Sequence, residues 1–445
     1  MPEEEVIVGA DIGTLNCAMA GMNNGRVFVI DIELDKKTAP SKLLIDKADD
    51  CLVPTSNMSN PRKGDIIIEH FKPFLGRTFP ADGSLKHDIK RWNTGWEVDG
   101  QGRPVYPVRG ENVSPEQAYA LLIKHLARMY QKQTHKTPTH VVLAVPAYWP
   151  APRRQAALDS AKIAGFDSVT KIISEPSAAV LGYVKQHPDI KGDNIVCIDI
   201  GGGTTDVASV YVNEERTLFV VNGTAGDNEL GGEHCTMALA DLCRRIKRIE
   251  LSEHKLRHAC EMAKTSGIYP MEIQLSDETS IEVTKSAYRD ACKPFLKKLG
   301  DLIDKVLKKN EDAKVIVVGG VFRDKVILEY CQDKIGIDKF IPPYSLSTAV
   351  AEGAAWFGQP NSGIVVRDSL HQSIGVETQD PSTGETDIFT EVINRGRGIP
   401  TVSSEIVLGA KGGLTEIKIY QGTYPTVDWG ERRRNYLFFG KGNRW

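Results

Sequence analysis

The stretch that decides the fold is Ile195-Val196-Cys197-Ile198-Asp199-Ile200-Gly201-Gly202-Gly203-Thr204-Thr205-Asp206. Its apolar start predicts a buried strand. The three consecutive glycines predict a turn, because their backbone freedom is costly unless it is needed. A glycine-rich turn after a strand lets backbone N–H groups approach a phosphate closely, and a carboxylate such as Asp199 can hold hydrated Mg²⁺ beside it. The stretch therefore predicts a phosphate-binding turn.

A shorter copy of this pattern opens the chain. Val6-Ile7-Val8 leads to Asp11-Ile12-Gly13-Thr14, and a second apolar run follows from Cys17 to Met22. The two turns stand about 190 residues apart, a duplication that suggests two similar lobes. A single Asp-Gly turn is usually a simple hairpin turn, so the inference depends on the pair. Two such turns facing each other would clamp a triphosphate and its metal between the lobes.

Composition and net charge argue against several classes of function. The 445 residues include 41% hydrophobic and 25% charged residues, which is ordinary for two or three globular domains. The formal net charge of −3 argues against a nucleic-acid or anionic-membrane binder, and we interpret Arg432-Arg433-Arg434 as a solvated charge run. No apolar run is long enough for a membrane span, and the acidic N-terminus lacks the order of a signal peptide. The eight cysteines form no Cys-x-x-Cys and are expected to be reduced thiols.

The remaining chain predicts an α/β body followed by a β unit. Ser114, Pro115 and Gln117 form the start of a helix with a capping box, and Val141 to Val145 reads as a buried strand. We expect a body at 1–360 with two lobes and a phosphate-binding cleft between them, a linker at 361–368, and a small, incomplete, sandwich-like β domain at 369–445.

Competing nucleotide motifs are absent. There is no Walker A loop, because Gly440-Lys441 is followed by glycine, and the dinucleotide fingerprint fails at residue 206. The roles of two carboxylates, Glu175 and Glu261, are less defined by local sequence than those of the Asp turns, because each residue also fits a purely structural role. Glu175 begins a helix, where it either stabilises the positive helix end or points into a cleft and orders a metal-bound water. Glu261 and Lys264 are by default a solvated ion pair.

Taken together, the motifs resemble the 70-kilodalton heat-shock chaperones, whose fold is the two-lobed actin-like ATPase. The resemblance covers about residues 5–360 and continues more weakly beyond them. Its motifs occur in the family's order at Asp11–Thr14, Val145–Tyr148 with Arg154-Gln155, Ile173–Ala179, Asp199–Asp206, Ala225–Asp227, Leu230–Glu233, Val318–Gly320 and Ala351–Ala355.

The resemblance implies a role for each site residue. Lys72 would position the hydrolytic water, with Glu175, Asp199 and Thr204 as the other catalytic residues. Asp11, Asp199 and Asp206 would hold Mg²⁺, largely through water. Pro146 and Arg154 would couple lobe rotation to the second domain. ATP or ADP would contact Gly13, Thr14, Leu15, Gly201, Gly202 and Gly203 through its phosphates, and Gly231, Gly232, Glu261, Lys264, Gly319, Gly320 and Arg323 through its adenosine.

Several residues depart from the family pattern. Leu15 replaces a threonine, Thr265 an arginine that stacks on adenine, Val321 a serine that bonds the base, and Ser347 an aspartate. Losing the stacking cation and one hydrogen bond weakens adenosine binding by about 1–3 kcal/mol. Arg367 lies in the linker, and we expect this charge to disfavour docking of the linker onto the ATPase lobe. The later strands and helical lid of the family's peptide-binding domain do not follow.

The resemblance thus implies an ATP-binding and ATP-hydrolysing chaperone-type protein, with turnover weakened by the departures. The alternative is a nucleotide-dependent regulatory or interaction protein with little peptide binding. A J-domain co-chaperone and a nucleotide-exchange factor are the implied partners, with unfolded peptide as a further one and no nucleic acid or membrane. The expected location is cytoplasmic, with the nucleus as an alternative.

Overall fold

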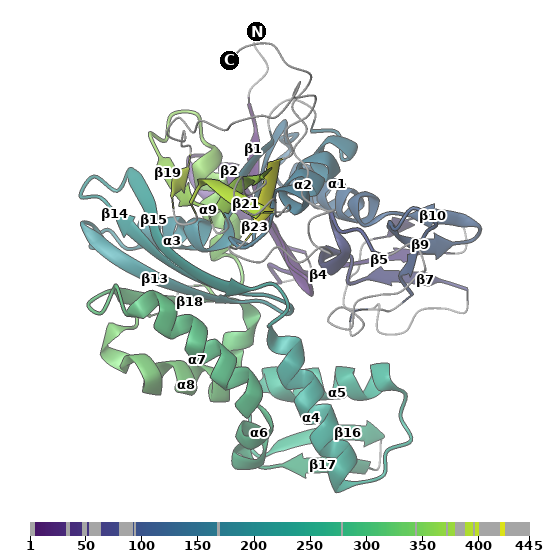
Figure 1. The fold of residues 1–445 in the computed structure, drawn as a ribbon. Coiled ribbons are helices and arrows are strands. Elements are labelled where there is room, and N and C mark those ends of the chain that lie inside the picture. The colour runs from purple at the N-terminus through teal and green to yellow at the C-terminus, as the bar shows by residue number, and fades with distance from the viewer. Residues whose placement is uncertain are drawn as a thin grey trace.

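The structure is a computed structural model in which two lobes carry most of the chain (Figure 1). It describes residues 5–32, 36–46, 51–52, 64–79, 92, 95–166, 170–276, 279–342, 345–370, 373–378, 388–394, 397–399 and 419–422. Mixed strands and helices fill both lobes, which confirms the predicted α/β class for the body of the chain.

The first lobe is built on a sheet in which β1 (Ile7–Ile12) lies at the centre. It runs parallel to β11 (His140–Val145) and antiparallel to β2 (Asn16–Asn23). The sheet continues to β12 (Thr170–Ser174) on one side and to β3 (Arg26–Val29) on the other, and β4 (Ala39–Pro40) pairs with β2. Helices α1 (Pro115–Thr134) and α2 (Ala151–Ile163) pack against this sheet.

The second lobe repeats this pairing. Strand β13 (Asp193–Ile200) runs parallel to β18 (Lys314–Val318) and antiparallel to β14 (Thr205–Val212), which pairs with β15 (Leu218–Asp227). The duplication predicted from the two Asp turns is therefore present as two sheets of matching topology. Asp11 and Asp199 end the equivalent strands, β1 and β13.

Two helices pack between the sheets. Helix α9 (Ala349–Gly358) lies on the first sheet and against α3 (Glu175–Gln186), which in turn contacts β13 and β14. The contact needs small residues, because a Cβ on Gly353 would lie 1.7 Å from the carbonyl oxygen of Ala178. One apolar core, containing Ile7, Ala179 and Cys197, therefore joins both lobes.

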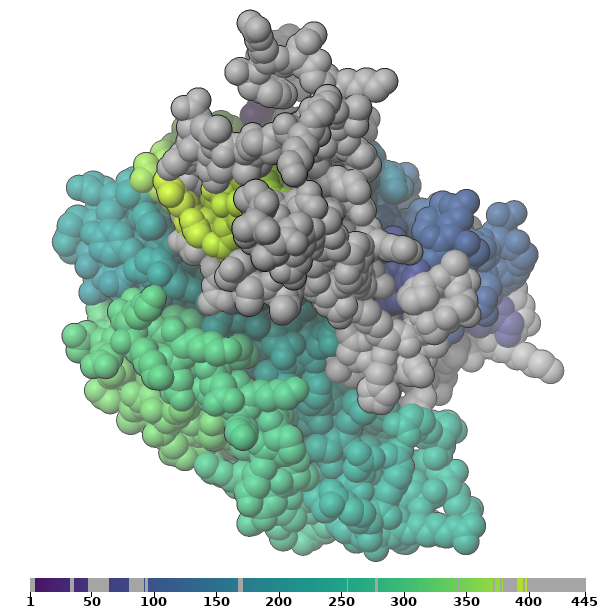
Figure 2. All heavy atoms as spheres, in the orientation of Figure 1, coloured from purple at the N-terminus to yellow at the C-terminus, as the bar shows by residue number. Residues whose placement is uncertain are grey.

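Each lobe also carries a peripheral subdomain. Beside the first sheet stand short strands, and below the second sheet lies a helical region that fills the lower part of the face in Figure 2. The strands are β5 (Lys42–Ile45), β6 (Cys51–Leu52), β7 (Ile66–Glu69), β8 (Glu97–Val98), β9 (Pro104–Val108) and β10 (Glu111–Val113). The helical region comprises α4 (Gly232–Ile246), α5 (Glu253–Ser266), β16 (Met271–Ser276), β17 (Thr279–Val283), α6 (Lys285–Ala291), α7 (Lys293–Leu307) and α8 (Lys325–Ile335).

Local sequence signals account for individual elements. The Ser114 hydroxyl accepts the Gln117 backbone N–H, and the Gln117 side chain accepts the Ser114 N–H, so the predicted capping box is present. The β2–β3 hairpin turns through Asn24 and Gly25, both in the left-handed region with φ of 51° and 75°. Seven cysteines are free and buried, as predicted for reduced thiols, and the side chain of Cys51 lies outside the described part.

The linker docks onto the second lobe, contrary to the expectation drawn from Arg367. Strand β19 (Val365–Ser369) pairs in parallel with β15, and the backbone N–H of Val365 donates to Thr217 O at 2.7 Å. Alternation along the strand places Val366 against the core and leaves Arg367 exposed. The guanidinium is never buried, so it carries no desolvation cost against docking.

Only parts of the predicted β domain at 369–445 are described. Strands β20 (Ser373–Thr378), β21 (Ile388–Ile393) and β23 (Ile419–Gly422) form one antiparallel sheet, and β22 (Gly398–Ile399) pairs with β19. The rest of that prediction, including Arg432–Arg434, lies outside the described residues.

Among the helices that the structure describes, none is long and apolar enough to cross a bilayer.

Candidate functional site

A cleft opens where the two Asp turns meet, and it holds about 990 Å³ of space including its mouth. It gathers most of the residues singled out from the sequence. The predicted residues that line it are Asp11, Gly13, Thr14, Leu15, Lys72, Glu175, Asp199, Gly201, Gly202, Thr204, Gly232, Glu261, Lys264, Gly319, Gly320 and Arg323. Three others, Gly203, Asp206 and Gly231, lie behind the lining rather than on it.

The first turn follows β1 and is held by its own backbone. The Gly13 N–H donates to Asn16 O at 2.9 Å, and a Cβ on Gly13 would lie 2.5 Å from that oxygen. Thr14 is buried beside it. The turn therefore presents a tight backbone loop to the cleft, as a phosphate-binding turn requires.

The second turn is locked onto the helix that follows it. The Gly201 N–H donates to Thr204 O, while Gly201 O and Gly202 O accept the N–H groups of Gly232 and Glu233, each at 3.0 Å. A Cβ on Gly231 would lie 2.5 Å from Gly202 O. Gly203 packs against Trp92 and Thr14 instead of facing the cleft. These two glycines thus shape the site without lining it.

Acidic side chains converge between the turns. Asp11 and Asp199 end β1 and β13, and Glu175 begins α3. Burial, followed by the nearby Glu175 carboxylate, raises the pKa of Asp11 to about 7 despite the opposing effect of Lys72. The same causes, with Asp11 and Asp206 added, raise the pKa of Asp199 well above its ordinary value. Carboxylates in this position favour a bound cation.

One ammonium group stands among these carboxylates. Lys72 begins the short 3-10 turn Lys72–Phe74, and its Nζ lies 2.8 Å from Glu175 Oε1. The lysine is only 3% exposed, so the ion pair is shielded from water. The sequence leaves two positions open for Glu175, at the positive end of its helix or pointing into a cleft. The structure favours the second, because this carboxylate lines the cleft.

Asp206 lies one layer deeper, opposite Asp199 in the β13–β14 pair. Burial and then Glu175 raise its pKa to about 7, while the backbone N–H groups of Tyr148 and Ala147 act in the other direction. Its Oδ1 has no hydrogen-bond partner among the described residues. This oxygen is a buried acceptor, and its side chain lies on the same face of the β13–β14 pair as that of Asp199.

The loop that reaches Asp206 ties the lobes together. The Tyr148 hydroxyl donates to Thr224 O at 3.3 Å, and the Asn228 side chain donates to Tyr148 O at 3.2 Å. Arg154 braces the loop from the first lobe, donating from Nη2 to Ala147 O and from Nε to Trp149 O, each at 3.0 Å. The predicted coupling residue Arg154 thus holds a segment that contacts the other lobe.

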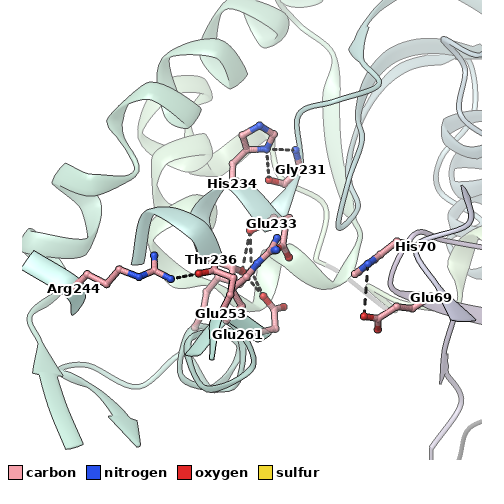
Figure 3. A network of polar contacts seen from close by, with 12 residues as sticks. Glu69, His70, Gly231, Glu233, His234, Thr236, Arg244, Glu253 and Glu261 are labelled. Atoms are coloured by element: carbon pink, nitrogen blue, oxygen red, sulfur yellow. Dashed lines mark hydrogen bonds and ion pairs between the residues drawn. The ribbon is translucent and has the colours of Figure 1, made fainter. Parts of the chain in front are cut away.

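The other half of the cleft is built from α4 and α5. Lys264 is 1% exposed, and its Nζ lies 2.6 Å from Glu261 Oε2 and 2.7 Å from Thr236 Oγ1. Burial alone would lower the pKa of Lys264, but Glu261 and its other acidic neighbours raise it on balance. Figure 3 shows Glu261 and Thr236 together, with Glu233 beside them. The default reading of Glu261 and Lys264 as a solvated pair is therefore wrong, because the two helices bury the lysine.

A third wall comes from the turn after β18. Gly319 has φ of 99°, and a Cβ there would lie 2.1 Å from Ile200 O. Arg323 donates to the Ser347 hydroxyl at 3.0 Å, and the Thr265 hydroxyl donates to Glu261 O at 2.8 Å. All four departures from the family pattern, at Leu15, Thr265, Val321 and Ser347, line the cleft.

Sequence reasoning missed several lining residues. Asn16 and Cys17 follow the first turn directly, so their position next to Asp11 was an available signal. Thr38, Leu346 and Val350 come from segments without any local chemical signal, and only the fold brings them to the cleft.

Two duplicated sheets with a cleft at their Asp turns are typical of a two-lobed nucleotide-binding protein. A family model described as Hsp70 protein matches residues 7–431. The heat shock cognate HSP70 protein of Trypanosoma brucei brucei is 29% identical over 98% of this chain and 69% of its own length. The chaperone protein dnaK of Cyanophora paradoxa is 28% identical over 93% of this chain and 69% of its own length.

The chain therefore belongs to the Hsp70 family. Membership supports a chaperone-type, ATP-binding function and does not favour the alternative of a purely regulatory interaction protein.

Proposed function

We propose that this protein binds and hydrolyses ATP, to ADP and phosphate, and uses the cycle to assist protein folding. The observation that carries the proposal is the Lys72–Glu175 pair, held buried between two glycine turns and beside Asp11 and Asp199. Phosphoryl transfer needs positioning and charge stabilisation more than covalent chemistry, and this arrangement supplies both.

In this proposal the two turns hold the phosphates. Backbone N–H groups of Thr14 and Leu15 would act from the first lobe, although Leu15 offers no hydroxyl. The Gly13 N–H is donated to Asn16 O, so Gly13 would shape this turn. The Gly202 backbone would act from the second, together with the hydroxyl of Thr204, while Gly201 and Gly203 would shape the turn. Both turns border the same cleft, so a triphosphate there would contact both lobes.

The residues present fit a magnesium ion. Carboxylate oxygens are the ligands that Mg²⁺ prefers, and Asp206 Oδ1 lacks any partner among the described residues. No group of three acidic, histidine or cysteine side chains in the described part is arranged to bind a metal directly. Asp11, Asp199 and Asp206 would therefore hold the ion largely through water. When bound, Mg²⁺ would neutralise charge on the phosphates.

Lys72 and Glu175 would act on the nucleophile. The fixed ammonium of Lys72 would orient the attacking water and offset negative charge as the γ-phosphate bond breaks. Glu175 holds that ammonium in place at 2.8 Å and would also contact the ordered water.

The adenosine would occupy the half of the cleft next to α4 and α5. Lys264, Glu261 and Arg323 would offer polar groups for the ribose. Gly232, Gly319 and Gly320 line the cleft and would form backbone platforms for the adenosine, with Gly231 behind them. A J-domain co-chaperone and a nucleotide-exchange factor are the proposed partners, with unfolded peptide as client. The cytoplasmic location remains a prediction.

The test combines ATP titration calorimetry with single-turnover hydrolysis, using the natural chain and Lys72→Ala. We expect the natural chain to bind and hydrolyse ATP, and Lys72→Ala to keep its affinity within about threefold while losing at least ~100-fold in rate. Binding without turnover in the natural chain would refute hydrolysis. Absence of ATP binding would refute the proposal as a whole.

A further inference from the structure

The ring of Trp149 contacts two cations next to the acidic cleft. The Arg153 guanidinium carbon lies 4.4 Å from the centroid of the Trp149 ring, and Lys72 Nζ lies 5.4 Å from the same ring. We propose that Arg153, stacked on Trp149, is a positioning residue that fixes Lys72 for the reaction. The inference rests on the proposed ATP hydrolysis, in which Lys72 acts at the γ-phosphate.

The contact is made to the backbone of Lys72. Arg153 Nη2 donates to Lys72 O at 2.8 Å, and the Leu75 N–H donates to the same oxygen at 3.3 Å. This carbonyl thus accepts two hydrogen bonds, one from its own turn and one from α2. These two hydrogen bonds fix the backbone of Lys72. Its side chain therefore starts from a fixed Cα position when it extends to Glu175.

Packing leaves the turn little room beside Arg153. A Cβ on Gly76 would lie 2.8 Å from Arg153 Cα and 2.7 Å from Pro152 O. The start of α2 and the 72–76 segment are therefore in direct backbone contact. Arg153 lies at that contact. Replacing its side chain should therefore affect the 72–76 segment, which carries Lys72, before any other part of the fold.

Arg153 is a costly residue to bury. Burial and the neighbouring Arg77 lower its pKa to about 9, with Glu229 and Glu175 opposing them, and its Nε has no partner among the described residues. An apolar side chain of similar volume often serves stability equally well at such a position. A buried guanidinium near Glu175 is therefore better explained by its role in positioning Lys72.

Trp149 serves this arrangement through its ring face. The residue is fully buried, and its indole Nε1 has no hydrogen-bond partner among the described residues. An indole normally finds an acceptor for this N–H when it is buried. The strong attraction between the indole face and a cation is the property that the site uses here.

The first experiment measures single-turnover ATP hydrolysis and ATP affinity for Arg153→Gln, Arg153→Lys, Trp149→Phe and Trp149→Leu. We expect Arg153→Gln and Trp149→Leu to lose about tenfold or more in rate, with ATP affinity within about threefold. Trp149→Phe keeps an aromatic face and should stay within about threefold of the natural rate. Arg153→Lys keeps the charge but not the planar stack, so it should recover less than half of the lost rate.

Lys162→Gln is the matched control, because Lys162 lies on the same helix but is exposed. It should leave rate and affinity unchanged. A natural rate in Arg153→Gln, or full recovery in Arg153→Lys, would overturn the inference. ATP-binding stoichiometry corrects each rate for any unfolded fraction, so a loss of stability alone does not imitate the effect.

A second measurement separates this inference from the proposed function. Amide hydrogen exchange of the 72–77 segment, followed by mass spectrometry without nucleotide, reports the summed protection of its N–H groups, among them the Leu75 N–H that is bonded to Lys72 O. We expect several-fold faster exchange there in Arg153→Gln than in the natural chain, with strand β11 unchanged as the internal reference. Equal exchange would overturn the positioning role even if the protein hydrolyses ATP. Faster exchange in a chain without turnover would retain the positioning contact while refuting the hydrolase.

Discussion

The side chain of Leu15 occupies the space above Gly202, so that a Cβ on Gly202 would lie 2.5 Å from Leu15 Cγ and Cδ1. The two Asp turns therefore touch here, in addition to the contact of Gly203 with Thr14. A leucine here, in place of the family's threonine, removes a hydroxyl from the cleft and adds an apolar contact between the lobes. Any added volume at this contact must therefore move one turn relative to the other, and we expect this to weaken the proposed nucleotide binding.

Gly202→Ala tests the contact. We expect ATP affinity to fall by about tenfold or more, because the added methyl group forces the turns apart and overpacking of this kind costs about 1–3 kcal/mol. Calorimetry measures the affinity, and thermal unfolding shows whether the fold is kept.

Leu15→Ala added to Gly202→Ala should restore most of the lost affinity, since only the Leu15 Cβ then remains close, at 3.3 Å, and a small shift relieves that contact. Gly223→Ala is the control, because a Cβ there meets nothing closer than 3.9 Å. A double variant as weak as Gly202→Ala would contradict the steric account.

The buried carboxylates predict a pH dependence of stability. The pKa of Asp206 is about 7 in the folded protein, against an ordinary value near 4 in the unfolded chain. The folded protein therefore holds a proton that the unfolded chain releases. This contribution is fully present below about pH 4 and is lost as the pH rises through about 7. Without nucleotide, the melting temperature should fall between about pH 5 and about pH 8.

Asp206→Asn should reduce that slope, because a neutral amide replaces the carboxyl that would ionise. The control is Asp159→Asn, at an exposed carboxylate on α2. An unchanged slope in Asp206→Asn would mean that other groups carry the pH dependence.

The docked linker makes a third prediction. Asp368 Oδ1 accepts hydrogen bonds from the hydroxyls of Ser174 at 3.0 Å and Ser177 at 3.1 Å, at the start of α3. Asp368→Ala removes both bonds, so we expect limited proteolysis within residues 361–370 to become several-fold faster. Arg367→Ala is the adjacent control, because that side chain is exposed. Similar cleavage rates for the two variants would show that strand pairing with β15 alone holds the linker.

The sequence allowed part of this site to be predicted because some of its chemistry is local. Asp199 and the glycines after it follow directly from one strand–turn motif, and Asp11 follows from its copy. Lys72 has no such motif around it and was identified only by resemblance, since its partner Glu175 lies 103 residues away.

Two readings failed because burial is a tertiary property. Lys264 has the spacing of a surface ion pair, yet the packing of α4 on α5 buries it. Arg367 has the charge of an undocked linker, yet strand alternation turns it outward. In each case the sequence shows the charge of the side chain but not whether the fold would bury it or leave it exposed.

The last prediction concerns the part of the cleft where we propose that the adenine base binds. Thr265 lines the cleft near Val321, and its hydroxyl is already used by Glu261 O. An arginine at this position would place a planar cation over the bound base, and such a contact contributes about 1–2 kcal/mol when it is desolvated. Thr265→Arg should therefore raise ATP affinity about tenfold while leaving tripolyphosphate affinity within about twofold, because tripolyphosphate has no base to stack on. Thr265→Gln, similar in length but uncharged, should leave both unchanged. An equal gain for ATP and tripolyphosphate in Thr265→Arg would show that the added charge acts on the phosphates, and would place the base elsewhere in the cleft.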